Sequence, residues 1–156
     1  MQGTMQDRPL TITSLFRHGR AINAGSQVVT CEGDHSRRAS FAQVAERADR
    51  LAAALARLGI RSGDRVGTFM WNHSQHLEVY IGAPTGGFVT HTLNLRLHPD
   101  DNTYIATHGG DRVLVADKVL WPLVEQFKDR VGFEHIIAVG AGPNGHARRE
   151  LPPPHR

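Results

Sequence analysis

Residues 64–97 read DRVGTFMWNHSQHLEVYIGAPTGGFVTHTLNLRL, and two apolar patterns alternate within them. Val66 to Trp71 is a short apolar run typical of a buried strand, and Phe88 to His91 is a second run of the same kind. Between them, Ser74 to Gly82 has the pattern of a helix. A strand, a helix and a strand in this order predict two parallel strands joined by a right-handed crossover.

The same alternation continues toward the C-terminus. Two further apolar runs, Val113 to Ala116 and Ile136 to Val139, are predicted strands. Pro99 to His108 and Lys118 to Arg130 precede them and are long enough for crossover helices. The sequence therefore predicts an α/β fold with a parallel, doubly wound sheet and flanking helices.

The residues before this sheet predict an antiparallel hairpin and a short helix. Gln27 to Glu32 and Arg37 to Phe41 are strand-like, and the turn-rich residues 33–36 separate them. Thr13 to Ile22 has a weakly amphipathic helical pattern. We expect this helix to pack on the domain and the hairpin to lead into the sheet.

The most regular helical pattern directly follows the hairpin. Apolar residues recur on one helix face from Phe41 to Leu58. Ser40 and Gln43 have the spacing of a capping box, in which each side chain binds the backbone N–H of the other residue. Gly59 follows at the position that favours a left-handed glycine. The pattern predicts a helix of about five turns.

The length of 156 residues suits one domain with its own core. We divide the chain into an N-terminal arm (1–9), a domain (10–140) and a tail (141–156) that is rich in Gly, Pro and Arg and is expected to be disordered. The only cysteine, Cys31, closes the apolar run that begins at Val28, so we interpret it as a small core residue. A single unpaired cysteine favours a reducing, cytoplasmic location.

Charge and hydropathy exclude two classes of partner. The formal net charge is +3, but three arginines lie in the tail, where a single glutamate opposes them: Arg148, Arg149, Arg156 and Glu150. Basic and acidic residues are nearly balanced elsewhere, so no basic stripe for nucleic acid is predicted. No apolar run reaches the roughly 18 residues that a membrane span needs, and the first residues do not resemble a secretion signal.

Several polar groups have spacings that invite a site. His73 and His76 lie three residues apart with Glu78 nearby, but a closed zinc site needs three or four converging ligands. We expect these three to be solvated helix residues. Asp100 and Asp101 are adjacent, so their side chains diverge on a helix, and stabilising the helix dipole explains them. No metal site is predicted.

Residues 140–145 form a literal G-x-G-x-x-G after a predicted strand. A dinucleotide site also needs a helix that opens at the third glycine and an acidic residue about 20 positions later. Only eleven residues follow, and three of them are consecutive prolines. We interpret this segment as a flexible linker.

Four segments together resemble a known family. Gly63 to Val66 (GDRV) enters a predicted strand, Trp71-Asn72 leaves it, and Asp111 to Val113 (DRV) precedes another strand. His91 to Leu97 reads HTLNLRL, which departs from the family's HTLNPRL only at Leu95. Taken in their order along the chain, the segments resemble the N-terminal region of fatty acyl-CoA ligases, members of the acyl-adenylate-forming (AMP-binding) superfamily. The missing proline removes a rigid turn residue from the loop.

The resemblance implies an incomplete N-terminal subdomain of the acyl-adenylate-forming fold. Complete members use ATP, Mg²⁺ and CoA to convert a medium- or long-chain fatty acid to an acyl-adenylate and then to a thioester. Their phosphate loop, adenine and magnesium segment, ribose-binding Asp and catalytic Lys have no counterpart here. We therefore expect no catalytic, cofactor-binding or metal residue in this chain. Arg96 either contacts an anion or ties its loop to a carboxylate or a helix end, and we favour the second role.

Three hypotheses for function remain open at this stage. In the first, the chain is a truncated piece of a fatty acyl-CoA ligase and is inactive alone. In the second, it is a non-enzymatic assembly module, because half of a doubly wound domain leaves an apolar face or a sheet edge for self-association. In the third, it is a small nucleotide-binding α/β domain, since fold alone does not fix function.

Overall fold

A computed structural model describes residues 9–32 and 34–140 of the chain. Its regular elements are, in order, α1 (Ile12–Ile22), β1 (Gln27–Glu32), β2 (His35–Ser40), α2 (Phe41–Arg57), β3 (Arg65–Phe69), α3 (Ser74–Thr85), β4 (Val89–Thr92), α4 (Pro99–Gly109), β5 (Asp111–Asp117), η1 (Lys118–Leu120), α5 (Trp121–Val124), η2 (Lys128–Arg130) and β6 (His135–Val139). Apart from Pro9, the predicted arm and tail lie outside the described residues, as do 141–145 of the glycine motif.

The predicted parallel sheet is confirmed. Its four strands pair in the order β4-β3-β5-β6, and every neighbouring pair is parallel. The chain passes from β3 to β4 on one side and then crosses back to β5 on the other side of β3. The order of strand addition therefore reverses between β3 and β5, as in doubly wound folds.

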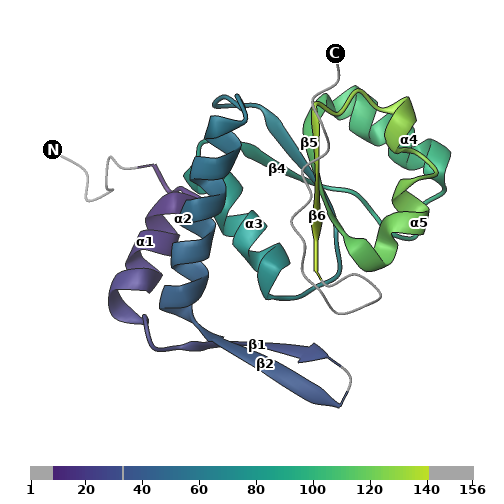
Figure 1. Ribbon diagram of the computed structural model, residues 1–156. Helices are drawn as coiled ribbons and strands as arrows, with labels where there is room; N and C mark the ends of the chain where they lie inside the picture. Colours follow the sequence, from purple (N-terminus) through teal and green to yellow (C-terminus); the bar gives the residue numbers. More distant parts are fainter. Residues whose placement is uncertain (1–8, 33, 141–156) are drawn as a thin grey trace, which may run out of the picture.

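Helices cover both faces of this sheet (Figure 1). On one face, α2 and α3 pack against β3 and β5 around a buried cluster that includes Leu55, Val66, Val79 and Val113. On the other face, α4, η1 and α5 pack around a cluster that includes Phe69, Ala106, Leu114 and Val124. Because both faces are covered, the central strands are apolar on both sides.

The hairpin and the long helix form as the sequence predicts. β1 and β2 pair antiparallel in register from Gln27–Ser40 to Glu32–His35, so β2 begins two residues earlier than predicted. Ser40 caps α2 by accepting a hydrogen bond from the N–H of Gln43, whose side chain accepts from the N–H of Ser40. Gly59 has φ +86°, which a left-handed glycine supplies at a helix end.

The prediction for Cys31 is wrong, because its side chain is exposed. Side chains alternate along a strand, and one face of this hairpin is packed against the domain. Thr30 is buried and Val28 is half-buried on that face, so Cys31 and Val29 face outward. The apolar run indicated a strand correctly but could not indicate which of its faces was covered.

The single helix predicted for residues 118–130 is also wrong. The segment forms three short pieces, η1, α5 and η2. Pro122 lies in the first turn of α5, and Phe127 has φ −135°, outside the helical region. Short turns nevertheless bring the apolar side chains of Leu120, Val124 and Phe127 to the same buried cluster.

Helix α1 packs on the domain as expected, but with fewer of its apolar side chains. It begins after Thr11, whose hydroxyl accepts from the N–H of Ser14, rather than at Thr13. Phe16 is its buried residue and meets Phe41 edge to face at 5.7 Å between ring centroids. Leu15 and Ile22 are exposed.

Candidate functional site

The sheet topology places the candidate site at the carboxyl ends of β3 and β5. These strands are neighbours in the sheet, although α3, β4 and α4 separate them in sequence. In open parallel sheets, ligands bind outside the carboxyl ends of the strands at the point where the strand order reverses. The residues that follow β3 and end β5 therefore define the place to examine.

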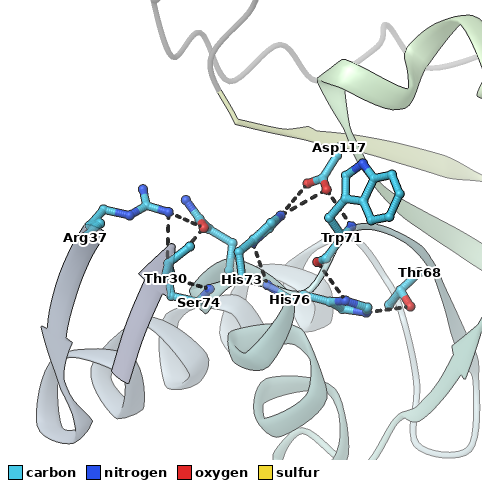
Figure 2. A network of polar contacts seen from close by, with 9 residues as sticks. Thr30, Arg37, Thr68, Trp71, His73, Ser74, His76 and Asp117 are labelled. Carbon is cyan, nitrogen blue, oxygen red and sulfur yellow. Dashed lines mark hydrogen bonds and ion pairs between the residues drawn. The ribbon is translucent and has the colours of Figure 1, made fainter. Parts of the chain in front are cut away.

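A buried carboxylate organises this edge (Figure 2). Asp117 is the last residue of β5 and is 4% exposed. Its Oδ2 accepts the backbone N–H of Trp71 at 2.7 Å, and its Oδ1 accepts Nε2–H of His73 at 2.8 Å. The loop after β3 is thereby fastened to the end of β5.

The second nitrogen of His73 caps α3. Nδ1 accepts the backbone N–H of His76 at 3.3 Å, so the proton must lie on Nε2, where it faces Asp117. His73 therefore joins a helix N-terminus to a strand end with both ring nitrogens. An imidazole bound in this way has no nitrogen left to act as a general base.

His76 is a buried histidine with two partners of its own. Nδ1–H donates to the carbonyl oxygen of Trp71 at 3.2 Å, and Nε2 accepts the hydroxyl of Thr68 at 3.0 Å. Burial lowers the pKa of His76, and the hydrogen bond to Trp71 opposes that change. The ring is held neutral beneath the loop.

The expectation that His73, His76 and Glu78 are solvated is wrong. His76 and Glu78 are 6% and 9% exposed, because His76 lies against Thr68 of β3 and the loop at Trp71, while Glu78 faces Arg47 of α2. Arg47 of α2 pairs with Glu78 (Nε to Oε1, 2.7 Å). Burial raises the pKa of Glu78, and Arg47 opposes that rise. Among residues 9–32 and 34–140, no three His, Cys, Asp or Glu side chains gather as metal ligands.

The hairpin also takes part in this network. Thr30 of β1 accepts the backbone N–H of Ser74 at 3.0 Å, in a buried position. Arg37 of β2 donates to Oε1 of Gln75 at 2.8 Å. Figure 2 shows these contacts beside those of His73, so that one polar network runs from the hairpin to β5.

Arg96 lies in the loop after β4, at the same edge of the sheet. Its side chain is exposed, and in the part of the chain that the structure describes it shows no ion pair or hydrogen bond to a carboxylate or a helix end. The loop is held instead by Asn94, whose Oδ1 accepts the N–H of Arg96 at 2.9 Å. Leu95 packs against the core cluster. The anion contact of Arg96 stays a prediction.

The two DRV segments make contacts between the starts of the strands. Arg112 donates to Oε1 of Glu134 at 2.6 Å and to the carboxylate of Asp64, so it joins the starts of three strands. Asp111 accepts Nδ1–H of His91 at 2.7 Å. Asp100 pairs with Arg130 at the start of α4, in addition to its place in the first turn.

Sequence reasoning missed Asp117. The available signal was an acidic residue directly after the apolar strand Val113 to Ala116, the position at which parallel sheets place functional side chains. Its partner His73 lies 44 residues away, so their contact depends on the strand order. Together these residues form an edge whose hydrogen bonds are made within the protein.

None of the described helices has the length and apolar character needed to cross a bilayer.

The chain is similar in sequence to CoA ligases. The profile of the family described as AMP-binding enzyme matches residues 18–149. A 3-methylmercaptopropionyl-CoA ligase of Ruegeria lacuscaerulensis is 37% identical over 154 residues, which are 97% of this chain and 28% of the relative. A long-chain-fatty-acid–CoA ligase of Thermus thermophilus is 35% identical over 150 residues, 94% of this chain and 28% of the relative.

Solved structures agree with this result. The anthranilate CoA ligase AuaEII in complex with anthranoyl-AMP superimposes with a TM-score of 0.77 at 25% identity, over 87% of this chain and 27% of that one. The predicted resemblance to fatty acyl-CoA ligases is confirmed. The chain spans a little over a quarter of the length of these relatives.

Proposed function

The chain belongs to the AMP-binding enzyme family, and from that premise we propose that it supplies the N-terminal structural part of an ATP-dependent acyl-CoA ligase. The observation that carries the proposal is the sheet edge at Asp117, where the polar groups of Asp117, Trp71 and His73 form hydrogen bonds with one another or with neighbouring backbone. Such an edge fixes the shape of a sheet that supports a neighbouring active site. The acid to be activated is a medium- or long-chain fatty acid, as the names of two relatives indicate.

The residues at this edge do not fit ATP and Mg²⁺ by themselves. Adenylation develops negative charge that cations and N–H donors must stabilise. The carboxyl oxygens of Asp117 already accept two N–H groups, and His73 uses both of its nitrogens inside the protein. We therefore assign the chain no catalytic step, and we expect it to be inactive alone.

Pyrophosphate release tests this expectation. The purified 156-residue chain is assayed with ATP, Mg²⁺, CoA and fatty acids of medium and long chain, beside the complete Thermus thermophilus ligase as a positive control. We expect pyrophosphate at the rate of the enzyme-free blank. Fatty-acid-dependent turnover by the chain would overturn the proposal.

A complementation experiment tests the structural role directly. The Thermus thermophilus ligase is expressed without the segment that this chain matches, either alone or together with this chain. We expect activity only in the co-expressed pair. A chain variant with Val66→Asp, which places a charge in the core, serves as the control that should not restore activity. Restoration by both versions, or by neither, would contradict the structural role.

A second candidate function, self-assembly, is favoured by one feature of the sheet. β6 is an edge strand in the described chain, and all five of its residues are only half-buried. Edge strands with apolar side chains are templates for pairing with another chain. Sedimentation velocity over a range of concentrations is the test, and a monomer at every concentration would exclude this function.

The remaining parts of the proposal concern location and partners. We place the protein in the cytoplasm, where an exposed thiol such as Cys31 stays reduced. Nucleic acid is not a proposed partner, because basic and acidic residues are nearly balanced before the tail. A filter-binding assay at low salt, with retention of DNA or RNA as the contrary outcome, tests this point.

A further inference from the structure

A second polar feature lies beside the network, on the other side of Ser74. It is a pocket of about 290 Å³ between β2, the polar face of α2 and the start of α3. Four arginines line it, two from the strand and two from the helix: Arg37, Arg38, Arg47 and Arg50. Glu46 is the one acidic residue among the lining residues.

Four arginines and one carboxylate line the pocket, so its lining has a positive formal charge. Arg38 donates to the neutral amide oxygen of Gln27 at 2.8 Å, so its charge is not cancelled there. Arg50 pairs with Glu46 on the helix surface, and Arg47 pairs with the buried Glu78. Guanidinium groups with partly engaged forks still present further N–H donors to a ligand.

The start of helix α3 forms part of the pocket wall but supplies no free backbone N–H at Ser74 or His76. Its first-turn amides at Ser74 and His76 are already bound by Thr30 and His73. Ser74 is a buried residue, 4% exposed, and it lines the pocket. Recognition of a ligand must therefore come from the arginines.

We propose that this arginine pocket binds a phosphate or diphosphate group of a small metabolite. Planar guanidinium groups bind phosphate oxygens in pairs, and the charge-assisted hydrogen bonds that form are about twice as strong as neutral ones. The volume is at the lower end of small-molecule sites, so the phosphate end of a ligand is the part enclosed. The proposal does not depend on the proposed function, since the pocket uses none of the residues at Asp117.

Calorimetric titration of the 156-residue chain at low ionic strength tests the proposal. The probes are inorganic diphosphate, inorganic phosphate and glycerol 3-phosphate. Saturable binding of diphosphate is expected. Tighter binding of glycerol 3-phosphate than of inorganic phosphate identifies an ester as the ligand, and the reverse order identifies the free anion.

Variants separate the pocket from general surface charge. Arg38→Gln and Arg50→Gln should each raise the Kd for diphosphate roughly tenfold, the loss of one charge-assisted hydrogen bond. Arg57→Gln is the matched control, because Arg57 is an exposed arginine of the same helix outside the pocket, and it should leave the Kd within about twofold. All these positions are exposed, so the fold should be kept.

Glu46→Gln provides a test in the opposite direction. It removes the lining carboxylate that repels the ligand and releases Arg50, so the Kd should fall by about threefold. The proposal is overturned if diphosphate shows no saturable binding, if Arg57→Gln weakens binding as much as Arg38→Gln, or if Glu46→Gln weakens it.

Discussion

The two ends of β5 each carry a buried aspartate that accepts a hydrogen bond from a histidine, yet they are built differently. Asp117 at the carboxyl end has a donor for each oxygen, the N–H of Trp71 and Nε2–H of His73. Asp111 at the amino end has Nδ1–H of His91 on Oδ1. In the part of the chain that the structure describes, Oδ2 of Asp111 has no donor.

The difference shows what makes a buried carboxylate stabilising. On folding, a buried carboxylate gives up its hydrogen bonds with water. Protein donors replace those bonds when each oxygen has a partner, whereas an oxygen without a partner gains nothing in exchange. Burial accordingly raises the pKa of Asp111, and the hydrogen bond from His91 opposes that rise. Asp117 joins the end of β5 to the loop after β3, whereas Asp111 lies beside Gly67 of β3, where an added Cβ would come within 2.9 Å of Oδ2.

The largest effect is expected from matched substitutions of the two aspartates. Asp117→Asn turns one acceptor into a donor that faces Trp71 N–H or His73 Nε2–H, and it should lower the free energy of unfolding by about 3 kcal/mol. Asp111→Asn keeps the acceptor for His91 and should lower it by no more than about 1 kcal/mol. Urea unfolding followed by circular dichroism measures both, and equal losses would refute the comparison.

Gly67→Ala should have the next largest effect. A Cβ there would lie 2.9 Å from Oδ2 of Asp111 and 3.3 Å from the carbonyl oxygen of Val113, so we expect a loss of about 2 kcal/mol in unfolding free energy. Gly132→Ala is the control, because nothing lies within 4 Å of a Cβ at that position. The double variant Gly67→Ala with Asp111→Ala should lose less unfolding free energy than the two single variants together. Strict additivity would contradict the contact between the two residues.

The smallest effect is a difference in pH dependence between the two ends. The pKa of His76 is lowered by burial, so the folded state binds fewer protons than the unfolded chain near the unfolded value of about 6.5. Stability should therefore be complete above that pH and should decline as the pH falls below it. His76→Asn should flatten the unfolding free energy between about pH 7 and pH 5.

Asp111 should act in the opposite direction at lower pH. Its pKa is raised in the folded state, so its contribution to stability is complete below the unfolded value of about 3.8 and is lost as the pH rises through the folded value. Asp111→Asn should remove this loss and leave the decline due to His76 unchanged. A variant that altered both parts of the pH profile would show that the two ends are coupled.

The sequence predicts those features that depend on neighbouring residues. The capping box of Ser40 and Gln43 and the alternation of apolar strands with helices need only local spacing, and both are confirmed. The contact of His73 with Asp117 needs the order of the strands, which local spacing does not contain. Cys31 and His76 fail for a related reason, because the covering of a face is a property of the assembled layers.

The open edge of β6 has a consequence for how such a chain is made. β3 is synthesised first and has no partner until β4 and β5 follow. Each later strand pairs with a strand that is already synthesised. At about 5–20 residues per second, these strands leave the ribosome within tens of seconds, and domains fold as units in that order. In relatives of which this chain spans 28%, most of the polypeptide is translated later. If the chain is the N-terminal part of a ligase, as we propose, the half-buried edge of β6 is a preformed surface on which the later part can fold.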